Sequence, residues 1–285
     1  MSALFELHER PDLDNPVLIV ALDGWIDAGY GAAAALRTVR EHNEFVTVAT
    51  FDTDNLLDHR SRRPSMTLVD GVNTGLTWPT IELCAGVDRS GNDVLLLVGA
   101  EPDHTWRAFA DASVDLALEF GARLVTGLGA YPAPVPHTRP TRIVSTATSR
   151  DLAEVVGFIP GRIEVPAGVA AAIELRAAEL GLPAVGLWAQ VPHYASAMPY
   201  PAAAAALIDG LDHAAGVRFG TGDLVDEAAK TRTRLDELVS GSPEHLDLVR
   251  QLEEQVDTLD TGTISEMSGD ELAAEFEKFL RDQES

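Results

Sequence analysis

Runs of apolar residues mark the segments that we expect at the centre of the fold. Residues 17–22 read VLIVAL without a polar interruption, which is typical of a strand covered on both faces of a sheet. The segments DVLLLV and VGLWAQV have the same character, with one polar residue each. Shorter or alternating segments add further strands. The predicted strands are 17–22, 44–51, 93–98, 123–128, 141–148 and 185–191.

Helical segments follow most of these strands. Residues 28–40 are rich in alanine and contain no proline, so they predict a helix directly after the first strand. Residues 168–180 predict a helix closed by Gly181, because glycine tolerates the left-handed backbone beyond a helix C-terminus. The predicted helices are 28–40, 104–120, a short one from 149, 168–180 and 201–215. Strands alternating with helices predict an α/β fold class, with a mainly parallel sheet sandwiched by helices.

Two β-rich segments interrupt this alternation. Residues 65–72 and 75–87 are joined by Asn73 and Thr74, which predicts an antiparallel β-hairpin that extends the sheet or projects from it. Further along the chain, residues 159–166 predict an irregular connection with room for a short strand at 162–165.

The pattern changes at residue 221, where amphipathic helices replace the strand and helix units. Apolar residues at helical spacing predict two helices, and Ser268 with Glu271 forms a capping box that predicts a third. We therefore expect an α/β core domain over 1–220 and an acidic helical C-terminal appendix over 221–285, packed on its own core or on another subunit. The two apolar stripes consist of Leu224, Ala228, Leu235 and Leu238, and of Leu246, Val249, Leu252, Val256 and Leu259.

Charge restricts the partners of the chain. The formal net charge is −24, and residues 221–285 alone carry 18 Asp and Glu against 6 Lys and Arg. Such acidity argues against nucleic-acid binding through a general electrostatic footprint. It predicts a solvated helical surface, with an acidic face for a basic partner as the alternative.

Other features of the composition indicate the compartment. No run of about 18 apolar residues occurs, so we expect no membrane span. The acidic N-terminal residues 1–16 do not predict a secretory signal. The single cysteine, Cys84, cannot form an internal disulfide, and its place in a strand predicts a buried, inert thiol. These features predict a cytoplasmic protein.

Four loops should meet at the carboxyl edge of the sheet, where open α/β folds usually bind ligands. These loops are 23–29, 99–103, 129–140 and 192–194. Carboxylates beside histidines could support general acid–base catalysis, because either group can reach a pKa near neutrality. The catalytic candidates are Asp23, Asp27, His137 and His193, and the candidates for ligand binding are Trp25, Gly29, Glu101, Tyr131, Arg139 and Tyr194.

Structural roles compete with these functional ones. Asp23 and Asp27 precede a predicted helix, so either carboxylate could cap its free amides. Arg139 follows three of the four prolines of its loop and could bind an anion, contact a subunit or pair with a nearby carboxylate.

The usual cofactor motifs do not occur in the sequence. Its histidines lack metal-site spacing, no P-loop or GxGxxG follows a strand, and no GxSxG elbow surrounds a serine. We therefore expect no metal and no cofactor.

Three segments nevertheless resemble a known family. ALDGWIDAGYGAA, GLGAYPAPVPHTRP and GLWAQVPHY, in this order and spacing, are similar to segments of the actinobacterial branch of the proteasome assembly chaperone 2 family. The resemblance covers residues 5–215. It implies a phosphorylase/hydrolase-like fold and self-association as a trimer, with no established reaction for the bacterial members.

The resemblance also implies partners. Eukaryotic members assist the assembly of proteasome α-rings, partly through C-terminal tails with a hydrophobic-Tyr-X ending, whereas this chain ends in residues 282–285, DQES. Docking of such a tail is therefore not expected, and proteasome subunits are partners by family analogy only.

Two functions follow from these observations. The first is an assembly-chaperone-family protein that acts through protein–protein contacts and forms a homo-oligomer. The alternative is a small-molecule hydrolase- or phosphorylase-like enzyme with its site at the carboxyl edge of the sheet.

Overall fold

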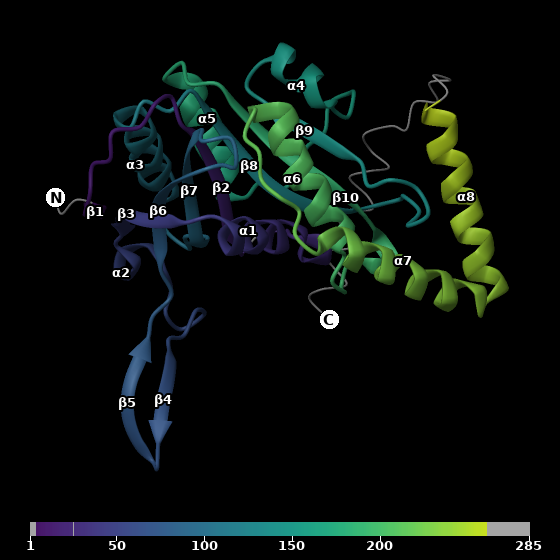
Figure 1. Ribbon diagram of the computed structural model, residues 1–285, viewed down its shortest axis with the longest axis horizontal. Helices are drawn as coiled ribbons and strands as arrows, with labels where there is room; N and C mark the ends of the chain where they lie inside the picture. Colours follow the sequence, from purple (N-terminus) through teal and green to yellow (C-terminus); the bar gives the residue numbers. More distant parts are fainter. Residues whose placement is uncertain (1–3, 25, 261–285) are drawn as a thin grey trace.

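The computed structural model describes residues 4–24 and 26–260, and its centre is an eight-stranded sheet (Figure 1). The three central pairings, β7–β2, β2–β8 and β8–β10, are parallel, and the four outer ones are antiparallel. The sheet is therefore mixed, and the prediction of a mainly parallel sheet was wrong. In spatial order the strands are β1 (Phe5–Leu7), β3 (Phe45–Phe51), β6 (Ile81–Val87), β7 (Asp93–Ala100), β2 (Val17–Asp23), β8 (Leu124–Ala133), β10 (Ala184–Pro192) and β9 (Ile143–Ala147).

A short connection explains one of the four antiparallel pairs. Strands β6 and β7 are joined only by residues 88–92, and a tight turn of this length can return the chain only antiparallel to itself. The parallel pairs in the centre all depend on longer crossovers through helices.

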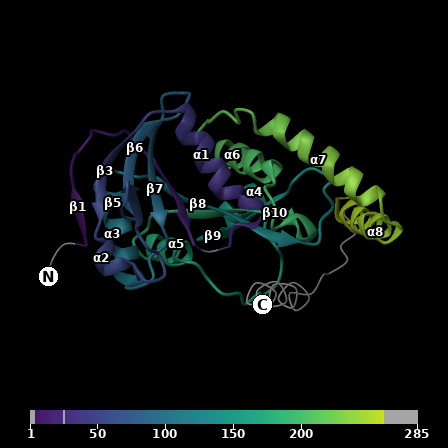
Figure 2. The same ribbon diagram turned by 90° about the horizontal axis from the view of Figure 1, so that it is seen from below.

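Helices cover both faces of the sheet, as the alternation of elements predicts. Figure 2 shows α1 (Gly31–His42) and α6 (Pro201–Ala215) on one face, with α3 (Trp106–Glu119) and α5 (Val169–Glu179) on the other. Strand β2 serves both cores, because Val17 and Ile19 pack towards α1 and α6 while Leu18 and Val20 pack towards α3 and α5. Burial on both faces is the physical reason for its unbroken apolar sequence. The short helices are α2 (Thr53–Leu56), α4 (Arg150–Val156) and the 3₁₀ turns η1 (Ala28–Tyr30) and η2 (His193–Ala195).

Most predicted elements are confirmed, with differences at their ends. Helix α6 has the predicted bounds, whereas β8 runs five residues past the predicted end at 128 and includes the start of the expected proline-rich loop. Residues 162–165 form no strand. Cys84 is buried as predicted, and burial raises the pKa of its thiol, which favours the unreactive protonated form.

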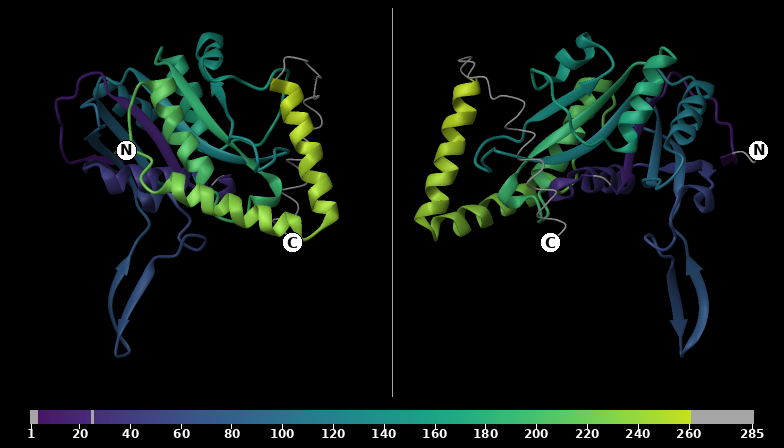
Figure 3. Two further views of the ribbon diagram at one scale, coloured as in Figure 1. Left: turned by 45° about the vertical axis from the view of Figure 1, so that its right-hand side comes forward. Right: turned by 180° about the vertical axis from the view of Figure 1, so that it is seen from behind.

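The β-hairpin exists, but its turn and extent differ from the prediction. Strands β4 (Ser65–Val69) and β5 (Val72–Thr77) are joined by Asp70 and Gly71, not by Asn73 and Thr74. Both turn residues have positive φ, 50° and 82°, as the tight turn of a twisted hairpin requires. The rest of the predicted second strand is β6 of the main sheet. The hairpin projects from the body of the molecule (Figures 1 and 3).

Two helices follow the α/β core. In α7 (Leu224–Ser240), Leu224 and Leu235 are buried in the core that contains α6, whereas Leu238 is 60% exposed and does not belong to the buried stripe. In α8 (Pro243–Asp260), Val249, Leu252 and Val256 are buried as predicted. Figure 3 shows α7 and α8 meeting at an angle beside the sheet. The predicted third helix with its capping box at Ser268 lies outside the described residues.

None of the helices in the described ranges combines the length and apolar character needed to cross a membrane. The division into two domains at residue 221 and the phosphorylase/hydrolase-like character of the fold stay predictions.

Candidate functional site

The turn after β2 has an unusual backbone. Gly29 and Tyr30 both have positive φ, 63° and 55°, which is a strained conformation for the tyrosine. A side chain at Gly29 would place its Cβ 2.6 Å from the Cβ of Tyr200. The structure therefore gives Gly29, a predicted ligand residue, a packing role in the turn.

Asp27 caps helix α1. Its carboxylate accepts hydrogen bonds from the backbone N–H groups of Ala32 (2.7 Å) and Ala33 (3.0 Å). Burial raises the pKa of Asp27, and the backbone hydrogen bonds offset part of this effect. The capping interpretation of this residue is thus confirmed.

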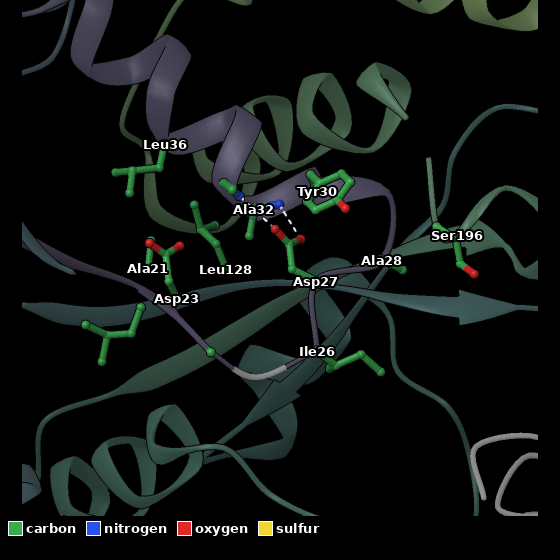
Figure 4. A pocket seen from close by; sticks show the side chains of 14 residues that line it. Ala21, Asp23, Ile26, Asp27, Ala28, Tyr30, Ala32, Leu36, Leu128 and Ser196 are labelled. Atoms are coloured by element: carbon green, nitrogen blue, oxygen red, sulfur yellow. Dashed lines mark hydrogen bonds between the residues drawn. The ribbon is translucent and has the colours of Figure 1, made fainter. Parts of the chain in front are cut away.

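Asp23 lies beside Asp27 in the wall of a cavity of about 520 Å³. Figure 4 shows both carboxylates below the first turn of α1, and dashed lines mark the two hydrogen bonds of Asp27. Partial burial raises the pKa of Asp23, and the positive charge of Arg62 opposes the shift. Tyr30, Leu36 and Leu128 are among the other residues that line this cavity, which holds none of the candidate histidines.

Glu101 and Tyr131 line a different cavity, of about 330 Å³. Glu101 Oε1 accepts a hydrogen bond from the N–H of Val169 at 2.7 Å, and burial raises the pKa of Glu101. Gln190 donates to the hydroxyl of Tyr131 at 2.8 Å, and burial raises the pKa of Tyr131 to about 12. Both side chains are thus held in fixed positions on this wall.

His137 and Arg139 lie in a third cavity, of about 300 Å³, between the proline-rich loop, α6 and α7. Nδ1 of the buried His137 is 2.7 Å from the hydroxyl of Tyr194, and its Nε2 is 3.1 Å from a carboxylate oxygen of Asp236 on α7. Burial raises the pKa of Tyr194 to about 12. His137 and Tyr194 therefore connect the loop to the C-terminal helices.

Arg139 is paired with carboxylates of α8. Its guanidinium donates to both oxygens of Asp257 (2.8 and 2.7 Å) and to Glu253 (3.0 Å). The hydrogen bonds from Arg139 lower the pKa of Asp257. The carboxylate-pairing alternative for Arg139 is confirmed.

The four loops are neighbours, as predicted: the N–H of Glu101 donates to the backbone oxygen of Asp23 at 2.6 Å, Asp27 and Ala130 form a parallel β-bridge, and His137 contacts Tyr194. Their candidate side chains, however, line three different cavities and not one. His193 lines none of the three cavities, its ring packs against Tyr194, and its buried Nδ1 has no hydrogen-bond partner in the described part of the chain. Trp25 lies outside the described residues. Among residues 4–24 and 26–260, no group of three His, Cys, Asp or Glu side chains is arranged to hold a metal ion.

The model of the PAC2 family matches residues 21–239, which is most of the chain and includes all residues that line the three cavities except Val20. The chain belongs to the PAC2 family. This confirms the resemblance carried by the three segments described above.

Several solved structures similar to this PAC2 protein come from actinobacteria. A Mycobacterium tuberculosis protein of unknown function, Rv2714, is 35% identical, with 99% of this chain and 97% of that one covered and a TM-score of 0.85. A Corynebacterium glutamicum protein of unknown function is 30% identical, with 90% and 98% covered and a TM-score of 0.83. The M. tuberculosis proteasome-assembly chaperone homologue Rv2125 is 31% identical, with 82% and 99% covered and a TM-score of 0.75. No curated protein matches the chain.

One residue of this PAC2 protein that the sequence did not single out is Glu174. It lies on α5 in the same cavity as Glu101, and burial raises its pKa to about 7. The only signal in the sequence is its place beside Ile173 in an alanine-rich helix, and this spacing does not reveal what the side chain faces.

Proposed function

We propose that this PAC2 protein is a self-associating assembly factor that acts through protein–protein contacts, in line with the chaperone named among its relatives. The observation that carries the proposal is the projecting hairpin β4–β5. All eleven residues of its two strands are exposed, including Met66, Leu68, Val72 and Leu76. An isolated two-stranded hairpin is marginally stable in water, and exposed apolar groups of this kind mark interaction sites.

We assign a second copy of this chain as the partner of the hairpin. Between Ser65 and Trp78 the only charged residue is Asp70, although the whole chain carries a net charge of −24. Two copies repel each other through most of their surface, but they can meet at this nearly uncharged arm without bringing carboxylates together. The family resemblance adds a trimer as the expected assembly and a proteasome subunit as the expected client.

The enzymatic alternative receives less support from the geometry. A hydrolase-like mechanism needs a general acid and a general base that both reach the reacting atoms of one bound substrate. Asp23 and Asp27 line one cavity, His137 lines another, and Asp27 already accepts two backbone hydrogen bonds. We therefore favour protein binding over catalysis.

The test is the mass of the full-length protein in solution, measured by light scattering and native mass spectrometry. The wild type should form an oligomer. Leu76→Asp should shift it to monomers, because the new carboxylate would have to lose its bound water when the contact forms, which costs free energy. Leu175→Asp, which changes an exposed leucine on α5, should leave the mass unchanged. A monomeric wild type, or a Leu76→Asp variant that keeps the oligomer, would contradict the hairpin contact.

Adding purified proteasome α-subunits to the same measurement tests whether a proteasome subunit is the client. The absence of a mixed complex would argue against this client.

A further inference from the structure

The cavity that contains Glu174 lies between α5 and the sheet, and part of its wall comes from residues between 159 and 168, which form no helix or strand before the start of α5. Its volume of about 330 Å³ is at the lower end of the range for small-molecule sites. Apolar side chains, among them Leu22, Ile159, Ile163 and Trp188, form most of its wall. Gly186 leaves the space for the carboxylate, because a Cβ there would lie 2.5 Å from Glu174 Oε1.

The two carboxylates in this cavity, Glu101 and Glu174, differ in the positive charges and hydrogen-bond donors that surround them. Glu101 accepts the N–H of Val169 in the first turn of α5, and this hydrogen bond and the charge of Arg62 offset part of the rise in its pKa that burial causes. Glu174 accepts a hydrogen bond from the hydroxyl of Thr146, 3.1 Å from Oε2, and that hydroxyl also accepts the indole N–H of Trp188 at 3.3 Å. No Lys, Arg or His is among the described residues that line the cavity. Glu174 is thus a half-buried carboxylate whose counter-charge the cavity wall does not supply.

We propose that this cavity binds a small monocationic molecule with an apolar body, an alkylamine or arylalkylamine, whose ammonium group pairs with Glu174. The ammonium would supply the missing charge and donate to the carboxylate oxygens, and the apolar body would replace water against the isoleucine and tryptophan side chains. This site is separate from the hairpin, so the proposal does not depend on the proposed assembly function.

The affinity for such an amine should depend on pH. Burial raises the pKa of Glu174 to about 7, and Tyr131 in the same cavity, with its pKa raised to about 12, stays neutral. Other charged groups lie on the elements that pack against α5. Asp111 and Asp115 on α3 interact electrostatically with Arg176. Glu101 accepts the hydrogen bond of Val169. An alkylamine with a pKa of about 10 stays charged from about pH 6 to 8, so its affinity should fall about tenfold as the pH drops over that range and Glu174 gains a proton.

The test uses calorimetry of the full-length protein with phenethylamine and with its neutral analogue 2-phenylethanol. At pH 8 the amine should bind at least tenfold more tightly than the alcohol. Glu174→Gln should remove this preference and the pH dependence. Glu179→Gln, a change on the same helix at an exposed residue paired with Arg176, should behave as the wild type.

Three results would overturn the proposal: no binding of either probe to the wild type, equal affinity for amine and alcohol, or undiminished amine binding by Glu174→Gln. Should Glu174→Gln fail to fold, the pH series on the wild type decides, and a flat or reversed profile would count against the site. The mass of the oligomer, measured in parallel, reports on the assembly function independently.

Discussion

At the scale of single residues, Asp27 shows how a carboxylate in a ligand-binding position can serve the fold instead. It follows a parallel strand, where substrates usually bind, yet both oxygens accept N–H groups of α1. These groups have no partner inside the helix, and the negative charge also favours the positive end of the helix dipole. Its neighbour Asp23 lines the same cavity, and the positive charge of Arg62 acts on its carboxylate.

Replacing Asp27 tests the cap directly. Asp27→Ala should lower the free energy of unfolding by about 1 kcal/mol, because two amides of α1 lose their acceptor. Asp27→Asn keeps one acceptor oxygen and should lose less. Urea unfolding followed by circular dichroism measures both changes, and an Asp27→Ala variant as stable as the wild type would show that water replaces the cap at no cost.

At the scale of elements, the proline-rich loop fastens the C-terminal helices to the core. Arg139 joins Asp257 and Glu253 of α8, and Thr138 donates to Glu253 at 2.5 Å. His137 reaches Asp236 of α7. The loop thus contributes mainly to the placement of α7 and α8, which the sequence did not predict.

Removing the Arg139 side chain should loosen α8 selectively. Arg139→Ala should increase hydrogen exchange over residues 243–260 and leave the exchange of β2 and β8 unchanged. The change in global stability should stay below about 1 kcal/mol, because ion pairs of this exposure contribute little. Arg150→Ala, which breaks a pair within the exposed helix α4, is the control and should not affect α8. Unchanged exchange in α8 would mean that its apolar stripe alone holds it.

At the scale of the whole molecule, charge opposes any assembly of identical copies. A net charge of −24 creates a repulsive field around every copy, and the hairpin, with Asp70 as the only charged residue between Ser65 and Trp78, adds little to it. Assembly through the hairpin must therefore depend on how strongly salt screens the remaining charges.

Salt should strengthen self-association. Raising NaCl from about 0.05 M to about 0.5 M shortens the Debye length from over 10 Å to under 5 Å, so the repulsion between copies falls while the apolar contact of the hairpin remains. Sedimentation equilibrium at both concentrations should show a smaller dissociation constant in high salt. An assembly that weakens in high salt would instead point to a contact made by opposite charges.

Much of the local structure follows from the sequence by itself. The unbroken apolar residues of β2, the bounds of α6, the cap at Asp27 and the buried stripe of α8 all depend on neighbours within a few positions, and spacing along the chain reports them. The three segments that resemble the PAC2 family are also local, because each consists of part of a strand and the residues that directly follow it. The turn of the hairpin was one exception, because Asp70-Gly71 and Asn73-Thr74 are both acceptable turn sequences and cross-strand pairing selects between them.

Only the tertiary structure decided which residues meet. The mixed sheet depends on the lateral order of eight strands, and local periodicity carries no information on that order. The separation of the candidate residues into three cavities follows from the extension of β8, which carries the proline-rich loop away from Asp23 and towards α7 and α8. Glu174 became a candidate because α5 turns it towards Thr146 on β9, 28 residues earlier in the chain. Such long-range contacts set burial and charge compensation, and these two quantities determine the chemistry of a carboxylate.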